Sequence, residues 1–346
     1  MHLSLGSGWR MPAEWARHAA TWMVWPHNQA LWESGWRVSL ADVQRDYARV
    51  AQAIARFEPV KMVVDPSALQ SARALCGANI ELIELAVDDS WCRDSGPSFV
   101  CHPQHGLAGL SWRLNAWGGK SQHSQDRSLG RRILDQLGLD GFSTFLCNEG
   151  GAIHVDGEGT LITTESVLLN PNRNPGIDKA EFEACFARYL GISKTIWLPG
   201  DPQYVTGDMT DGHVDGVCAF ARPGVLLVDA THDHGSVYAE VVRENRRALE
   251  LASDAQGRHF ELLDLYEASA AVDQDAEVFC ASYTNFYIAN GAIIMPAYGI
   301  AADQDAAEQL AHAFPGREIV PVRIDAIAHG GGGIHCITQQ QPQVQP

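Results

Sequence analysis

Positive charge is scarce in this 346-residue sequence, which contains 25 lysines and arginines but 42 aspartates and glutamates. The formal net charge is therefore -17 at pH 7. Nucleic acids and anionic membranes bind basic surfaces, so this balance argues against both as partners. An acidic protein of this kind instead attracts small cationic molecules.

Closely spaced cysteines are also missing. No two of the cysteines form a Cys-x-x-Cys pair, so the spacing of a zinc finger is absent. Scattered cysteines in a chain of this length are typical of reduced thiols, which predicts a cytoplasmic location. The eight cysteines stand at positions 76, 92, 101, 147, 185, 218, 280 and 336.

Neither a signal peptide nor a membrane-spanning segment is evident. Residues 1–22 lack a basic start followed by an apolar block. One long uncharged run, residues 278–302, contains an Ala-Asn-Gly break, and we interpret it as two strands around a turn. No linker rich in glycine, serine or proline divides the chain, and no internal repeat is visible in its letters. The sequence therefore predicts a single domain over residues 1–346.

Helical and strand patterns alternate along the chain. Apolar residues spaced alternately by three and four predict a helix over residues 39–57, and a strand pattern follows at 59–65. Asp178 and Glu181 form a capping-box pattern at the start of another helix. The same alternation continues to the C-terminal region and indicates an α/β architecture.

Glycines occur together with acids, histidine or cysteine in four polar clusters. Glycine lets the backbone approach a ligand closely, and loops beside fixed strands are common places for sites. Taken alone, each cluster has a structural explanation. Asp88, Asp89 and Asp94 are typical turn or cap formers, and a lone cysteine such as Cys336 is usually a packing residue. The clusters are residues 88–97, 148–159, 207–216 and 330–336.

The combination of these clusters indicates nucleophilic chemistry on a cation. A cysteine attacks as the thiolate while a histidine moves protons. Several carboxylates would oppose the oxyanion that forms in a protease, but they fit the planar donors of a guanidinium.

Seven stretches then carry a family resemblance: RMPAEWARHAATWMVWP, DDSWCRDSGP, EGGAIHVDGEGTLITTE, LLNPNRNP, TDGHVDG, SYTNFYIANGAIIMPAYG and GGGGIHCITQQQP. Together they closely resemble the agmatine deiminases, and the match runs in order over residues 9–342. The wider relatives of that family are arginine deiminases, bacterial peptidylarginine deiminases and amidinotransferases.

This resemblance implies a fold and a reaction. The fold is a five-bladed pseudosymmetric α/β propeller, or pentein, built from ββαβ units around a central site. The reaction converts agmatine and water to N-carbamoylputrescine and ammonia through a Cys S-alkylthiouronium intermediate, with no metal and no other cofactor. The implied partner is a small cationic guanidine, and a homodimer or homotetramer is compatible with the family.

The resemblance also implies residue roles. Cys336 matches the nucleophile, and His213 matches the general acid and base. Asp94 and Asp215 match the carboxylates that bind the guanidinium nitrogens, and Glu149 matches the acid that orients the histidine. Because the carboxylates should raise the pKa of the thiol until the cation binds, we expect the thiolate to form mainly in the complex.

Other residues are candidates for secondary roles. Trp91 is expected to pack on the substrate near Asp94, and Asp89 and Asp208 are candidates for contact with a substrate amine. His335 should point to the opposite face from Cys336 if their segment is extended. Structural roles are expected for His154, Cys92 and Cys218.

Four positions depart from the pattern of the agmatine deiminases. Glycines replace polar residues at Gly207, Gly216 and Gly333, and Met209 replaces another. These changes thin the polar lining, so a different guanidine also fits the sequence: an arginine-like compound, a guanidino acid or peptidyl-arginine.

Three other functions also stay open. Residues 229–235 have a passing likeness to the metal motif of manganese ureohydrolases, although the spacing differs by one residue. Amidino transfer to an amine would use the same cysteine. A guanidine-binding protein without activity could keep the pocket, but it would be expected to lose Cys336 or His213.

Overall fold

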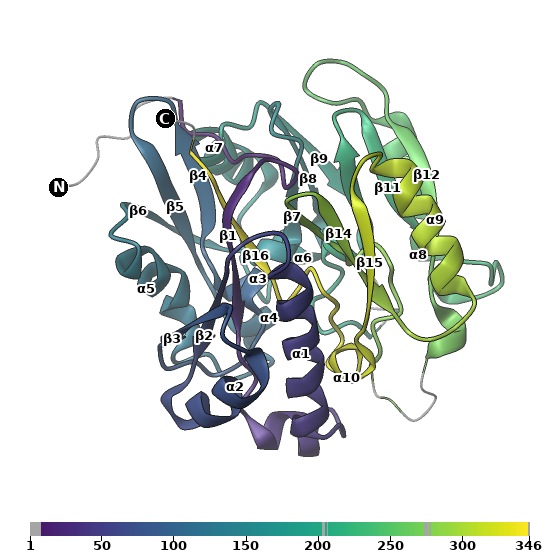
Figure 1. Cartoon of the computed structure of the whole chain (residues 1–346). Helices are drawn as coiled ribbons and strands as arrows, with labels where there is room; N and C mark the ends of the chain where they lie inside the picture. Colours follow the sequence, from purple (N-terminus) through teal and green to yellow (C-terminus); the bar gives the residue numbers. More distant parts are fainter. Residues whose placement is uncertain (1–7, 203–204, 206, 273–275, 277, 345–346) are drawn as a thin grey trace.

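Within the residues that the structure describes, the strands form five small sheets (Figure 1). The computed structural model describes residues 8–202, 205, 207–272, 276 and 278–344. The strands within these residues are β1 (His18–Val24), β2 (Val60–Val64), β3 (Ile80–Glu84), β4 (Ser98–His102), β5 (Gly106–Arg113), β6 (Gly141–Cys147), β7 (Ile153–Val155), β8 (Thr160–Thr164), β9 (Lys194–Leu198), β10 (Cys218–Arg222), β11 (Val225–Ala230), β12 (Glu261–Tyr266), β13 (Tyr287–Ala289), β14 (Ala292–Ala297), β15 (Glu318–Arg323) and β16 (Gln339–Pro342).

The helices vary from single turns to four turns in length. The α-helices are α1 (Leu40–Ile54), α2 (Leu69–Cys76), α3 (Cys92–Ser95), α4 (Ala116–Gly119), α5 (Leu129–Gln136), α6 (Glu165–Leu168), α7 (Lys179–Leu190), α8 (Val237–Leu251), α9 (Ala302–Ala313) and α10 (Asp325–Ala328). Short tighter or wider turns of helix are η1 (Ala30–Gly35), η2 (Pro66–Ala68), η3 (Asp126–Ser128), η4 (Gly150–Ala152), η5 (Val214–Gly216) and η6 (Ser269–Ala271).

Four of the sheets share one chain path. An antiparallel strand pair comes first, a helix crosses over, and a third strand then pairs parallel to the second. The sheets β4–β5–β6, β7–β8–β9, β10–β11–β12 and β13–β14–β15 follow this path with α5, α7, α8 and α9 as their crossover helices. These are ββαβ units, and their repeat is not visible in the residue letters.

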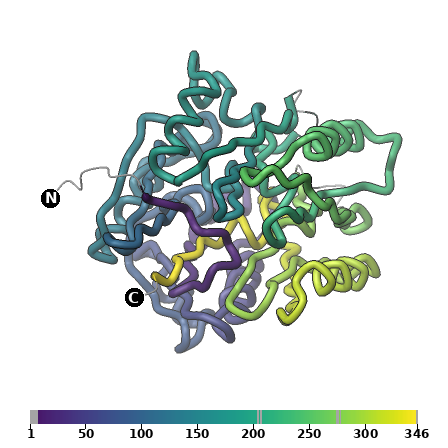
Figure 2. The backbone as a smooth tube through the Cα atoms, turned by 90° about the horizontal axis from the view of Figure 1, so that it is seen from above, coloured from purple at the N-terminus to yellow at the C-terminus, as the bar shows by residue number. Residues whose placement is uncertain are grey.

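The fifth sheet is completed by the two end regions of the chain. β1 pairs parallel with β2 after the crossover through α1, and it pairs antiparallel with β16, where Trp22 lies opposite Gln339. Figure 2 shows these N-terminal and C-terminal segments, purple and yellow, running side by side. β16 therefore acts as the first strand of this unit, and the predicted propeller of five ββαβ units is confirmed.

Several local predictions are confirmed as well. The helix expected at 39–57 is α1, which buries the apolar stripe of Val43, Val50 and Ile54. Asp178 and Glu181 form both bonds of a capping box at the start of α7. The uncharged run at 278–302 contains the antiparallel pair β13 and β14. Nowhere in the described ranges does a helix reach the length and apolarity that crossing a membrane requires.

The connections between units decide where the site lies. The first strands of neighbouring units contact one another, as β16 does with β4 and β7 with β10. Three of the polar clusters lie in the connections β3–β4, β9–β10 and β15–β16, and the fourth begins in the connection β6–β7 and continues through β7, so their starting points are equivalent in the ring. The fifth connection, β12–β13, spans residues 267–286 and was not among the predicted clusters.

Candidate active site

A cavity of about 510 Å³ lies at the ends of three of these connections. Its wall includes Cys336, His213 and Asp215 from the predicted site, and Asp208 and Asn285 beside them. The volume falls in the range of about 300–1,000 Å³ that is common for small-molecule sites. The ring of connections therefore leaves room for a ligand at the cysteine.

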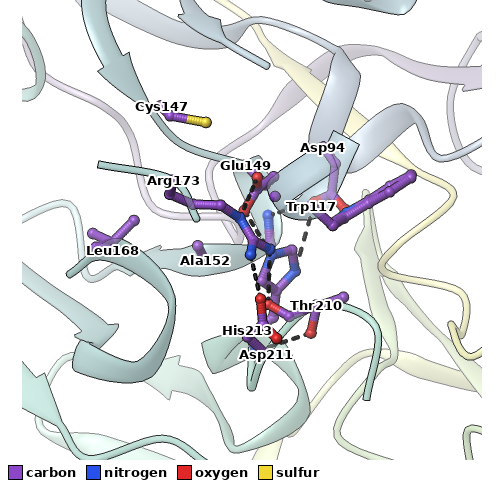
Figure 3. A network of polar contacts seen from close by, with 12 residues as sticks. Asp94, Trp117, Cys147, Glu149, Ala152, Leu168, Arg173, Thr210, Asp211 and His213 are labelled. Carbon is purple, nitrogen blue, oxygen red and sulfur yellow. Dashed lines mark hydrogen bonds and ion pairs between the residues drawn. The ribbon is translucent and has the colours of Figure 1, made fainter. Parts of the chain in front are cut away.

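His213 lies between two buried carboxylates (Figure 3). Its Nε2 is 3.2 Å from Glu149 Oε2, and its Nδ1 is 3.8 Å from Asp94 Oδ1. Burial alone would lower the pKa of this imidazole, but the charge of Asp94 and the hydrogen bond and charge of Glu149 raise it to about 9. His213 is thus an imidazolium at neutral pH, ready to donate a proton.

Glu149 is held by a buried arginine, Arg173, for which the sequence predicted no role. Arg173 donates from Nε to Glu149 Oε1 at 3.1 Å, and it also pairs with Asp211 and donates to the Thr210 carbonyl at 3.0 Å. Burial raises the pKa of Glu149, but His213 and Arg173 outweigh it and the net pKa is lowered. Arg173 stands within the LLNPNRNP stretch, which carried the resemblance without a role for this residue.

Asp94 is oriented by two donors. Trp117 Nε1 donates to Oδ2 at 2.8 Å, and the backbone N–H of Gly151 donates to Oδ1 at 3.0 Å. Burial raises the pKa of Asp94, His213 lowers it, and the charges of Asp215 and Glu149 raise it again, so the net pKa is raised. A bound cation would therefore stabilise the ionised form of this carboxyl.

Gly151 marks the point where the three groups converge. A Cβ at this residue would lie 2.7 Å from His213 Nδ1, 2.9 Å from Asp215 Oδ2 and 3.0 Å from Asp94 Oδ1. Any side chain here would press on all three groups at once. The second glycine of the Glu-Gly-Gly sequence is thus required by the site rather than by a turn.

Cys336 lies beside Asp215. Its Sγ is 3.6 Å from Asp215 Oδ2, and its backbone N–H donates to Asn285 Oδ1 at 3.2 Å. Burial, followed by the charges of Asp215, Cys280 and Asp94, raises the pKa of the thiol well above its usual value. This direction agrees with our prediction that the thiolate forms mainly when a cation binds. Asn285 comes from the fifth connection and stands within the SYTNFYIANGAIIMPAYG stretch, which carried the resemblance without a role for this residue.

The condition on which the expectation for His335 rested, an extended segment, is not met. Residues 334–337 form a turn instead of an extended strand, so the alternation of side chains does not apply. His335 Nδ1 lies 2.9 Å from Asp215 Oδ2, the same oxygen that faces Cys336. The residue therefore belongs to the site.

Of the candidates for secondary roles, Trp91, Asp208 and Asp89, only Asp208 lines the cavity as the structure describes it. Trp91 is buried against Trp32, and a Cβ on Gly332 would lie 2.4 Å from its ring. Asp208 lines the cavity, and it accepts the N–H of Thr210 at 2.9 Å. Asp89 is buried and accepts the N–H of Ser90 at 2.7 Å, away from the cavity wall as the structure describes it.

The four departures do not all reach the cavity. Of these positions, Gly216 lines the wall and faces open space. Met209 is half-buried against the core, and Gly207 has open space around it. A Cβ on Gly333 would lie 2.6 Å from Asn285 Oδ1, so Asn285 fills the place that a longer side chain would need.

The residues of the ureohydrolase-like stretch serve other contacts. Asp229 accepts the hydroxyls of Tyr238 and Ser282, and His232 stacks on Tyr266 with ring centroids 3.9 Å apart. Within the described ranges, the residues close enough to share a metal ion are Glu14, His154 and His335, and none of these belongs to residues 229–235.

Structural roles were expected for Cys92, Cys218 and His154. Cys92 and Cys218 are fully buried, as expected for structural residues. His154 is buried too, and burial lowers its pKa to about 4, so the imidazole is neutral. It stacks on His335 with ring centroids 6.0 Å apart.

The centre of this five-unit α/β propeller holds a thiol, an imidazole and several carboxylates. This fold and this site together are those of a deiminase. Residues 10–342 match the family of Porphyromonas-type peptidyl-arginine deiminases, and the chain belongs to this family.

Three relatives give the comparison more detail. The chain is 41% identical over 360 residues to the agmatine deiminase of Stutzerimonas stutzeri, covering 97% of this chain and 96% of the relative. It is also 41% identical over 360 residues to the agmatine deiminase of Pseudomonas fluorescens, with 97% and 96% covered. A solved structure of the agmatine deiminase of Enterococcus faecalis superimposes with a TM-score of 0.92 at 34% identity, covering 98% of this chain and 99% of the other.

Proposed function

We propose that this protein deiminates agmatine, giving N-carbamoylputrescine and ammonia. One observation carries the proposal: the His213 imidazolium and the Asp94 and Asp215 carboxylates converge around Gly151, and the Cys336 thiol lies against Asp215. A flat cation with several N–H donors fits between two carboxylates. The similarity to proteins named agmatine deiminase supports the same reaction.

The first half of the reaction joins Cys336 to the guanidinium carbon of the substrate. The guanidinium cation lowers the pKa of the thiol as it binds, and the thiol proton passes to solvent. The Cys336 thiolate forms a C–S bond at the guanidinium carbon, and His213 gives its proton to the nitrogen that leaves as ammonia. The product of this step is a thiouronium joined to Cys336.

The second half regenerates the site. The now neutral His213 takes a proton from water, and the oxygen attacks the thiouronium carbon. The hydroxyl of this adduct loses its proton to solvent as the C–S bond breaks, the urea product leaves, and the Cys336 thiolate regains a proton from solvent. Asp94, Asp215 and Glu149 remain anionic, and their work is to hold the guanidinium flat and to keep His213 charged.

The acidic lining of the cavity bears on the choice of guanidine. Asp208, Asp229 and Glu267 line the cavity, and the described lining residues include neither lysine nor arginine. Burial raises the pKa of Asp229 to about 7 and raises the pKa of Glu267 as well, so an ammonium group at the distal end of the substrate would stabilise their ionised forms, whereas a carboxylate would not. This charge pattern supports agmatine over arginine and over guanidino acids.

The substrate is tested with a panel of guanidines. We expect ammonia release from agmatine to exceed release from arginine, 4-guanidinobutyrate and peptidyl-arginine by about 100-fold in kcat/KM, because each of these lacks the free distal ammonium or adds a carboxylate or a bulky chain. Guanidine-dependent ammonia release that places agmatine among the poor substrates would remove the claim for agmatine and leave deimination intact.

The state of the free thiol provides a second test. The rate of Cys336 alkylation by iodoacetamide, measured against pH in the absence of substrate, should rise only in the alkaline range, because burial and nearby carboxylates raise the thiol pKa. Peptide mass mapping separates Cys336 from the other cysteines. An apparent pKa below about 7 in the free protein would contradict the thiol state described above.

A further inference from the structure

Asp215 belongs to a series of buried ionic contacts whose other members have no role in the reaction proposed above. His335 Nδ1 is 2.9 Å from Asp215 Oδ2, and His335 Nε2 is 2.9 Å from Glu14 Oε1. Arg93 donates from Nη1 to Glu14 Oε1 at 3.1 Å and from Nε to the His335 carbonyl at 3.3 Å. All four side chains are at least nine-tenths buried, so water does not screen these contacts.

The geometry sets the charge of His335. Both ring nitrogens face carboxylate oxygens, which only accept hydrogen bonds. A neutral imidazole has one N–H and would leave one of these contacts without a proton, whereas an imidazolium donates to both. The groups facing this ring are Asp215, Glu14, Arg93 and the neutral His154, so two cations balance two anions.

The contact with Asp215 links these ionic contacts to the reacting atoms. Asp215 Oδ2 accepts from His335 and also lies 3.6 Å from Cys336 Sγ. We propose that His335, held as an imidazolium by Glu14, is a positioning residue that keeps Asp215 ionised and fixes its orientation toward the guanidinium and the nucleophile. This inference rests on the deiminase function proposed above for its kinetic consequences, but the charge of His335 and the reactivity of the thiol can be measured without any substrate.

A metal ion at the same place fits the contacts less well. Glu14, His154 and His335 each offer a ligand atom, and these atoms lie within 4.8 Å of one another. Arg93 already places a guanidinium on Glu14, and its positive charge would repel a divalent cation. The imidazolium therefore accounts for the cluster on its own.

Nuclear magnetic resonance tests the charge directly. In ¹⁵N-histidine-labelled protein at pH 8, His335 should show two protonated ring nitrogens, with its signals assigned by their loss in His335→Gln. Glu14→Gln removes the anion that faces Nε2 and that stabilises the protonated ring. We therefore expect the His335 ring to be neutral at pH 8 in this variant. A His335 ring that is neutral throughout pH 6–8 in the unaltered protein would overturn the proposal.

The thiol and the kinetics test the consequence for Asp215. Replacing His335 with glutamine removes the positive charge beside Asp215, so the acidic limb of kcat/KM should move up by one pH unit or more, and kcat/KM at pH 7 should fall about 10-fold or more. Alkylation of Cys336 should become slower at a given pH, because the uncompensated Asp215 charge raises the thiol pKa further.

Matched variants separate this role from a general loss of structure. His312→Gln, an exposed position on α9, should match the unaltered protein in every measurement. If His335→Gln does not fold, Glu14→Gln carries the same kinetic and alkylation tests. Unchanged pH profiles and alkylation rates in folded variants would refute the positioning role. A protein that fails to turn over agmatine but shows the expected ring charge and alkylation shift would refute the proposed function alone.

Discussion

Replacing Cys336 with serine is expected to lower kcat for agmatine by on the order of 10⁴-fold or more, the scale seen when the nucleophile of a covalent catalyst is removed. The hydroxyl is too weak a nucleophile at neutral pH for a carbon whose positive charge is spread over three nitrogens. Agmatine should still bind, because Asp94 and Asp215 remain in place. Calorimetric titration measures the binding, and steady-state ammonia release measures kcat.

The matched control for this variant is Cys101→Ser, which changes a partly exposed cysteine on β4 and should leave turnover unchanged. Mass spectrometry of the acid-quenched reaction should detect an adduct on Cys336 in the unaltered protein but not in the serine variant. Retention of more than a tenth of the turnover by Cys336→Ser would exclude the covalent mechanism, whatever the substrate is.

Replacing His213 with glutamine is expected to lower kcat by about 10²–10⁴-fold, the contribution that a positioned acid and base usually makes. Glutamine can keep a hydrogen bond to Glu149, but it cannot protonate the departing ammonia or activate the water. The adduct on Cys336 should be scarce as well, because the first step also needs this proton.

The pH dependence of kcat/KM tests the same role of His213. The pKa of His213 is raised to about 9, so the proton that the first step needs is present below pH 9 and is lost as pH rises through that value. The alkaline limb of kcat/KM in the unaltered protein should therefore fall near pH 9, and this limb should be absent from His213→Gln. The exposed His312→Gln variant should keep it. An unshifted alkaline limb in His213→Gln would assign the titration to another group.

Some of the structure could be predicted from local patterns. The apolar spacing at 39–57 and the paired Asp178 and Glu181 both identify helices that the structure contains, because these signals lie within one turn or two of the backbone. The ring of five units could not be obtained in this way. It depends on strand pairs far apart in sequence, such as Trp22 with Gln339, and on a repeat of shape that the residue letters do not preserve.

The residues of the site likewise divide into those that the sequence could predict and those that it could not. The residues in distinctive motifs, such as Cys336 and His213, could be named because family resemblance marks them. Asn285 and Arg173 act through a neighbour and lie in loops whose approach follows from closure of the ring. The orientation of His335 was expected only for an extended segment, and alternation along a strand does not apply to it because residues 334–337 form a turn.

The pairing of β1 with β16 has a consequence for how the protein opens. Cys336 lies three residues before Gln339, the first residue of β16, and the strand pair joins segments more than 300 residues apart in the chain. A fluctuation that unzips this pair would release the strand and the nucleophile together, before the other four sheets unfold. Hydrogen exchange at the amides of β16 and the slow labelling of Cys336 by a bulky thiol reagent should then report the same opening event, so the protein loses its reactive centre at a lower free energy than it loses its fold.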